Sequence, residues 1–342
     1  MTFSFETRRS SVIPCLDLVS NIILKPRFRR DVLHRELRRV EEEDRLDEDQ
    51  ADEWARLLIE EVVFKGNGLG NPISNSNSSL AEITVKDLRS WYRKIVCAKR
   101  MAVVVTGNFD RGKVSEKIEK LFSHLPVGSK PTVSGFQDKQ RRLRLILVNR
   151  PTKVVQIAVA FPTFGFSHPH RITLSVLNSY LGAYGKESTR LNMRLSADYG
   201  VYSVWSNVWH FSDCGRIVVL TSVKSTGVLD VLKIIVHEIA LLRQRKLTSE
   251  ELWFAKKFLK DGARDLRYNP MDEAELFAEQ LLTTGDIIPG EQYIQAVNSV
   301  RSADIRRLAR KIFRPGKMNV VLIGPIQSLD RKQIASALRF SK

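Results

Sequence analysis

Two glutamates on one predicted helix are the residues of this chain best suited to bind a metal. Glu36 and Glu43 stand seven residues apart in the stretch LHRELRRVEEED (33–44). At 3.6 residues per turn, this spacing places both side chains on one helix face, two turns apart. Such a pair suits half of a metal site, but an acidic run beside basic residues is also typical of a solvated helix face.

Composition limits the classes of protein to which the chain can belong. It has 342 residues, 43% of them hydrophobic, which is enough for two domains with filled cores. Lys and Arg outnumber Asp and Glu by 55 to 38, a net charge of +17, so nucleic acid or an acidic surface must be considered as a partner. The basic residues are spread along the chain and do not alternate with aromatics, which argues against nucleic acid.

The cysteines and the apolar segments indicate which disulfides, thiolate metal sites and membrane segments to expect. Three widely spaced cysteines without a C-x-x-C motif indicate buried free thiols rather than disulfides or a thiolate zinc site. The first residues lack the apolar core of a signal peptide, and no window approaches the run of about 20 apolar residues that spans a bilayer. We therefore expect no transmembrane segment and a cytoplasmic location.

Helical periodicity dominates the first third of the chain, over 15–25 and 30–64. Thr84, with Asp87 three residues on, predicts a capped helix start. The nearly continuous apolar run at 101–107 (MAVVVTG) predicts a strand buried on both faces. A helix at 111–124 follows. We expect later strands at 143–149, 153–161, 201–209, 215–223 and 318–325, and helices at 168–182, 188–198, several within 227–313, and from Ser328.

A polar stretch rich in Pro, Gly and Ser predicts a domain boundary. We expect a first domain over 1–127, a linker over 128–140 and a second domain over 141–342. The segments MAVVVTGNF (101–109) and MNVVLIGP (318–325) each follow a helix with a basic end and precede a last helix, which indicates an internal repeat. Because the first unit is much shorter than the second, we expect it to be incomplete.

Several segments together resemble one family, in order and spacing, over nearly all of the chain. They are the E-x6-E pair Glu36 and Glu43, LGNPI (69–73), residues 83–110, KIEKLFSHLP (117–126), and LGAYGKESTRLNMRL (181–195) followed by YGVYSV. The chain resembles the pitrilysin and insulinase zinc metallopeptidases (inverzincins), nearest the mitochondrial-processing-peptidase type. The resemblance implies an α+β fold of two related sheet-plus-helix domains that form a clamshell, here with an incomplete first domain.

In that family an H-x-x-E-H helix supplies two zinc-binding histidines and a general base, and a downstream glutamate is the third ligand. The resemblance implies that Glu43 is this third ligand and that Glu36 is a supporting acid. None of the six histidines of this chain begins or ends an H-x-x-E-H motif. Zinc needs three protein ligands, so we expect this chain alone not to bind it. His34 and His124 are alternative ligands, although isolated histidines near helix ends are commonly caps or surface residues.

The family grips its substrate partly through an Arg and a Tyr in R-x-x-x-G-x-x-Y. This chain keeps Gly200 and Tyr202, but Ser196 stands at the aligned arginine position. Arg194 or Arg190 is then the expected replacement, because a serine cannot clamp a peptide group as a guanidinium does.

Three functions remain open. The first is a non-catalytic member that holds a peptide or unfolded protein, or that forms a homo- or hetero-oligomer with a peptidase-family subunit. The second is an active zinc metalloendopeptidase whose H-x-x-E-H segment is missing from the N-terminal side of this chain. The third is a basic binding protein that reuses the fold on nucleic acid or an acidic membrane surface.

Overall fold

The computed structural model describes residues 1–71, 80, 82–130, 135–183, 187–199, 201 and 204–340. It divides the chain into two compact units, and the chain passes between them more than once. The first unit comprises Met1–Glu42, Asn75–Ser134 and Ala263–Pro289, and the second comprises Glu43–Ser74, Gly135–Gly262 and Gly290–Lys342.

The second unit contains a five-stranded mixed sheet of order β1-β5-β2-β4-β3. Its strands are β1 (Arg144–Asn149), β2 (Val155–Phe164), β3 (Val204–His210), β4 (Cys214–Val223) and β5 (Asn319–Gly324). β5 pairs parallel with β1 and antiparallel with β2, and the other pairs are antiparallel. The α+β class expected from the sequence is confirmed.

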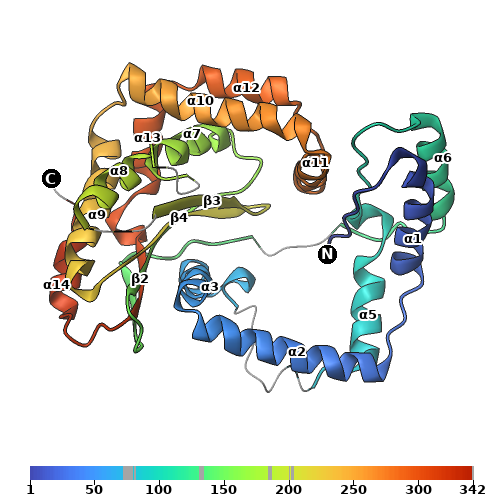
Figure 1. Cartoon of the computed structure of the whole chain (residues 1–342), viewed down its shortest axis with the longest axis horizontal. Helices are drawn as coiled ribbons and strands as arrows, with labels where there is room; N and C mark the ends of the chain where they lie inside the picture. The colour runs from blue at the N-terminus through green and yellow to red at the C-terminus, as the bar shows by residue number, and fades with distance from the viewer. Residues whose placement is uncertain are drawn as a thin grey trace. The chain divides into compact units, whose positions relative to one another are not determined.

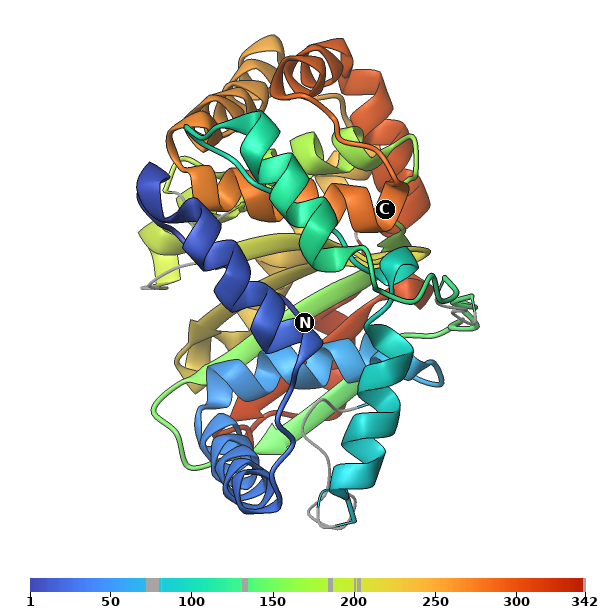
Figure 2. The same ribbon diagram turned by 90° about the vertical axis from the view of Figure 1, so that its right-hand side faces the viewer.

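Helices cover both faces of this sheet (Figure 1). Those of the second unit are α3 (Ala51–Val63), α7 (Arg171–Leu181), α8 (Arg190–Tyr199), α9 (Val228–Gln244), α10 (Ser249–Asp265), α12 (Gly290–Ser299), α13 (Ser302–Ile312) and α14 (Arg331–Ala337). α7, α9 and α13 belong to the main core on one face, whereas α3 packs on β2 and β5 from the other, as Figure 2 shows from the side. Because both faces are covered, β5 is buried along its whole length and reads as a continuous apolar run.

The first unit consists of helices packed without a sheet in the part of the chain that is described. They are α1 (Val12–Leu24), the beginning of α2 (Arg30–Asp49), α5 (Val85–Ile95), α6 (Arg111–Phe122) and α11 (Pro270–Thr284). The Tyr92 hydroxyl donates to the Ile23 carbonyl at 2.9 Å and joins α5 to α1. Lys117 pairs with Asp17 at 2.7 Å and joins α6 to α1.

Local signals in the sequence give most element positions correctly. Thr84 and Asp87 form the expected capping box at the start of α5. The helical pattern over 30–64 is interrupted at Gln50, whose extended backbone separates α2 from α3. The predicted division into domains over 1–127 and 141–342 stays a prediction.

One predicted element is wrong. Residues 101–107 form no strand, and Val103 is 41% exposed, although the run was expected to be buried on both faces. A strand exists only where a neighbouring strand completes its hydrogen-bond ladder. Among the described residues none forms a strand ladder with this segment, so its β-branched composition does not lead to a strand.

Candidate functional site

Both acidic residues of the expected zinc site lie on α2. Glu36 is exposed and accepts a hydrogen bond from Arg39 Nε at 2.9 Å, and Glu43 is exposed as well. Seven residues correspond to about 10 Å along a helix axis, whereas two oxygens on one zinc ion lie within about 4.5 Å of each other. Only one of these glutamates can therefore ligate a given zinc ion, and their assigned roles stay predictions.

The donor set of a zinc site is incomplete in the described part of the chain. No three His, Cys, Asp or Glu side chains there gather closely enough to hold a metal ion. His34 shares α2 with the glutamates but is exposed, and so is His124. These residues do not fit a catalytic zinc ion, which requires three protein ligands and a water.

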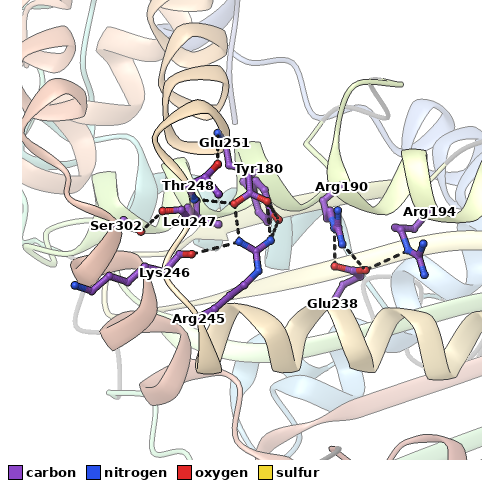
Figure 3. Close-up of polar contacts among 10 residues, drawn as sticks. All are labelled: Tyr180, Arg190, Arg194, Glu238, Arg245, Lys246, Leu247, Thr248, Glu251 and Ser302. Carbon is purple, nitrogen blue, oxygen red and sulfur yellow. Dashed lines mark hydrogen bonds and ion pairs between the residues drawn. The ribbon is translucent and has the colours of Figure 1, made fainter.

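The arginines expected to contact substrate meet one buried carboxylate (Figure 3). Arg190, the first residue of α8, donates from Nε to Glu238 Oε2 at 2.7 Å and from Nη2 to Oε1 at 3.2 Å. Arg194, one turn later, approaches Glu238 Oε1 at 3.4 Å. The Glu238 side chain, on α9, is only 2% exposed. A carboxylate buried to this degree needs such compensation, because its desolvation is costly.

The two arginines differ in how completely Glu238 occupies them. Arg190 uses both arms of its guanidinium in a fork on the carboxylate, and its side chain is 28% exposed. Arg194 makes one longer contact and is 47% exposed. A guanidinium has five N–H donors, so Arg194 retains donors for a further acceptor. Of the two, Arg194 has the chemistry to bind a peptide carbonyl or carboxylate.

β3, the edge strand beside α8, already has some of its outer backbone groups hydrogen-bonded within the chain. Asn192 donates from Nδ2 to the Val204 carbonyl at 2.8 Å and accepts from the Val204 amide at 3.0 Å. The Ser206 amide donates to the Gly182 carbonyl at 2.8 Å. These contacts fix α8, and with it both arginines, against β3.

Ser196, which stands at the position aligned with the family's arginine, bonds back to its own helix. Its hydroxyl donates to the Asn192 carbonyl at 2.6 Å. Gly200 and Tyr202 lie outside the described residues, and Tyr202 stays a predicted substrate contact.

A second polar network lies near these arginines and was not expected from the sequence (Figure 3). Arg245 forms a fork on Glu251, at 2.7 Å and 2.6 Å, and the Tyr180 hydroxyl donates to Glu251 Oε1 at 3.0 Å. The fork on Arg245 lowers the pKa of Glu251 to about 2. Burial, followed by the Glu251 charge, raises the pKa of Tyr180 to about 12. The network joins the ends of α7, α9 and α10 and is structural in character.

One part of this network does have a signal in the sequence. Thr248 and Glu251 form a reciprocal cap, in which the Thr248 amide donates to Glu251 Oε2 at 2.8 Å and the Glu251 amide donates to Thr248 Oγ1 at 3.1 Å. Their T-x-x-E spacing is that of a capping box, which could have placed the start of α10. The attachment of Arg245 and Tyr180 has no such local signature.

Comparison with known proteins decides the family. The family model described as "Peptidase M16 inactive domain" matches residues 82–259, just over half of the chain. The chain belongs to the peptidase M16 family. The processing-peptidase resemblance seen in the sequence is thereby confirmed.

Individual M16 relatives are distant but cover most of the chain. A probable mitochondrial-processing peptidase subunit beta of Arabidopsis thaliana is 24% identical over 96% of this chain and 64% of that protein. An uncharacterized zinc protease of Streptomyces coelicolor is also 24% identical, over 94% of this chain and 71% of that protein. The chain thus spans less than two thirds of the Arabidopsis relative.

Solved structures agree on the fold. A chain of complex III from Candida albicans superposes with a TM-score of 0.84 at 16% identity, and the superposition covers 97% of this chain and 81% of the Candida chain.

Relatives named as zinc proteases connect the M16 family with zinc. No helix in the described part of this M16 chain has the length and hydrophobicity needed to cross a bilayer. The expected cytoplasmic location stays a prediction, since the named relatives are mitochondrial and bacterial.

Proposed function

We propose that this chain is a non-catalytic M16 subunit that holds a peptide segment and associates with a peptidase-family subunit that carries the zinc site. The observation that carries the proposal is the incomplete donor set: the described residues offer Glu43 but no cluster of three metal ligands. The match to the inactive domain of the family supports the same conclusion. Relatives named as a processing peptidase subunit and as a complex III core protein make a partner of this type the natural choice.

Metal content and cleavage test this proposal directly. The chain should be purified alone and together with a co-expressed M16 subunit that carries H-x-x-E-H. Zinc should then be measured by mass spectrometry, and cleavage of a quenched fluorescent peptide should be followed with and without a chelator. We expect neither stoichiometric zinc nor chelator-sensitive cleavage from the chain alone. Both together in the isolated chain would refute the proposal.

Within this function, we assign peptide contact to Arg194 and support of Arg194 to Arg190. Arg194 is half exposed and keeps unused donors, while Arg190 is committed to Glu238. Fluorescence anisotropy with a labelled peptide should show weaker binding for Arg194→Met, with partial recovery for Arg194→Lys. Arg310→Met, at an exposed arginine on α13, is the matched control and should leave binding unchanged. Equal losses for Arg194→Met and Arg310→Met would indicate a general charge effect instead.

The second candidate is an active zinc endopeptidase completed by an H-x-x-E-H segment that this chain does not contain. The observation in its favour is that Glu36 and Glu43 remain on one exposed helix at the family's spacing. In any preparation that cleaves peptide, substitutions at Glu43 and Glu42 distinguish the active endopeptidase from the non-catalytic subunit. Glu43→Gln abolishes zinc binding and cleavage if Glu43 is a ligand, whereas Glu42→Gln, at the neighbouring exposed residue, is the matched control.

A further inference from the structure

A tight turn, residues 165–170, joins β2 to α7 and packs on the end of the β3–β4 hairpin. Gly165 lies so close to the hairpin that a Cβ atom there would stand 2.5 Å from the Ser212 carbonyl oxygen. The Phe166 amide donates to the Phe211 carbonyl at 2.8 Å. The turn and the hairpin are therefore in direct backbone contact.

Aromatic rings add to this contact. The His168 ring lies parallel to the Phe164 ring, with the centroids 3.8 Å apart, and the His210 ring also stacks on Phe164, at 5.9 Å. The Phe166 and His210 rings meet edge to face, 6.3 Å apart, and the Arg171 guanidinium lies 4.2 Å from the centre of the Phe166 ring. One histidine of the turn and one of the hairpin thus share the same aromatic cluster.

Both histidines make hydrogen bonds that require a neutral ring. The His170 amide donates to His168 Nδ1 at 3.1 Å, so this nitrogen carries no proton. His210 Nδ1 donates to the Phe164 carbonyl at 2.9 Å, so the lone pair of the neutral ring is on Nε2. That Nε2 is buried and has no hydrogen-bond partner among the described residues. A second proton would turn His168 Nδ1 toward another donor and would give His210 a buried N–H without an acceptor.

The surroundings of the two rings also oppose a positive charge. Burial, followed by the charges of His170 and Lys311, lowers the pKa of His168. Burial lowers the pKa of His210 by more than the backbone hydrogen bond of the ring raises it, and the Arg171 and His168 charges lower it further. Protonation therefore adds charge to a site that already holds cations.

The other titratable groups of the hairpin end do not compensate this charge. Asp213 accepts from the Phe136 amide at 2.6 Å and pairs with none of the histidines of the cluster. Cys214 stays a neutral thiol, because burial raises its pKa to about 12. In the part of the chain that the structure describes, acid thus loads the cluster with positive charge alone.

We propose that the 165–170 turn is an acid-sensitive latch, closed while His168 and His210 are neutral and opened by protonation of His168 Nδ1 and His210 Nε2. Opening frees the turn from the hairpin and uncovers Phe166, which is 6% exposed in the closed latch. The closed latch binds fewer protons than the open one, so its stability is complete above pH 6.5, the ordinary pKa of histidine, and falls as pH drops below that value. The latch does not depend on the proposed function.

Amide hydrogen exchange of the full chain, resolved by NMR and corrected for the intrinsic effect of pH, tests the proposal. The reporters are the amides of Phe166 and His170, which make hydrogen bonds within the closed latch. A histidine with a strongly lowered pKa weakens closing about tenfold at one pH unit below 6.5. Protection of both amides should therefore fall by about tenfold or more between about pH 7.5 and about pH 5.5. Amides of β5, in the core of the same unit, should stay slow.

Variants identify the groups that titrate. His168→Asn offers the His170 amide a side-chain oxygen in place of Nδ1, without a titratable ring. His210→Asn keeps a donor for the Phe164 carbonyl in the same way. The double variant loses the ring stacking, so it should be less protected than the unaltered chain at neutral pH, but its protection should hardly depend on pH. His237→Asn, at an exposed histidine of α9, is the matched control and should behave like the unaltered chain.

Four results would overturn the proposal. Equal protection of the Phe166 amide at both pH values would mean that the turn does not open. Equal losses in the turn and in β5 would mean that acid unfolds the whole unit. A pH dependence that survives in the double variant would mean that other groups titrate. Ring titrations of the unaltered chain supply the fourth test should the double variant not fold, and midpoints of His168 and His210 at or above 6.5 would contradict the latch. Zinc content and cleavage are independent of these readouts, so failure of the proposed function is recognised separately.

Discussion

Substitution of Arg190 should destabilise the second unit more than most other substitutions of partly exposed residues. The Glu238 side chain is 2% exposed, and the Arg190 guanidinium donates two hydrogen bonds to its carboxylate, at 2.7 Å and 3.2 Å. Breaking a buried pair from one side costs about 3–5 kcal/mol, because a charge is left without compensation. Arg190 is partly exposed and Arg194 remains nearby, so we expect Arg190→Met to cost about 3 kcal/mol. Arg194→Met, which loses one exposed contact at 3.4 Å, should cost about 0.5 kcal/mol.

Urea denaturation followed by tryptophan fluorescence measures these free energies of unfolding. Of the five tryptophans, only Trp91 belongs to the first unit, so a Trp91→Phe background makes the signal specific for the second. Arg190→Met combined with Glu238→Leu should be more stable than Arg190→Met alone, because no buried charge then remains. Equal costs for Arg190→Met and Arg194→Met, or a cost below about 1 kcal/mol for Arg190→Met, would refute the reasoning.

Three further predictions follow from the pKa values and the core. The Arg245 fork lowers the pKa of Glu251 from 4.5 to about 2, so Glu251 binds fewer protons in the folded chain than in the unfolded chain. The free energy of unfolding should therefore fall by about 2 kcal/mol as pH drops from 4.5 to 2. Glu251→Gln should reduce this loss in acid titrations of unfolding. Burial lowers the pKa of His210, so stability should also decline as pH falls below 6.5, and NMR titration of its ring should give a midpoint below that value. Phe313→Ala, which removes the ring 5.0 Å from that of Phe161, should cost about 3–5 kcal/mol in urea denaturation, against less for Phe313→Leu.

Local features of the chain were predictable because their causes lie within a few residues. The Thr84 and Asp87 cap depends on a side chain and an amide three positions apart, and it forms as expected. The strands of the second unit follow from short apolar runs, since each run has buried neighbours in the finished sheet. The spacing of Glu36 and Glu43 likewise fixes their common helix face.

Long-range features were decided by tertiary structure. The run at 101–107 has the composition of a buried strand, but strand formation depends on a neighbour that composition does not supply. The fork of Arg190 on Glu238 joins residues 48 positions apart, and the pair Arg216–Glu60 joins residues 156 positions apart. Nothing in the local sequence around Glu238 indicates that its carboxylate is buried and doubly approached by arginine.

The sequence by itself determined the α+β class, the family resemblance and the absence of H-x-x-E-H, because these depend on residue type and order alone. Only the tertiary structure distinguished Arg194, with donors to spare, from Arg190, which Glu238 holds by both arms. Only the tertiary structure separated the paired strand β5 from the similar run at 101–107, which forms no ladder with the described residues. Hydrogen-bond partners and burial depend on which distant segments meet, and that is a property of the folded chain.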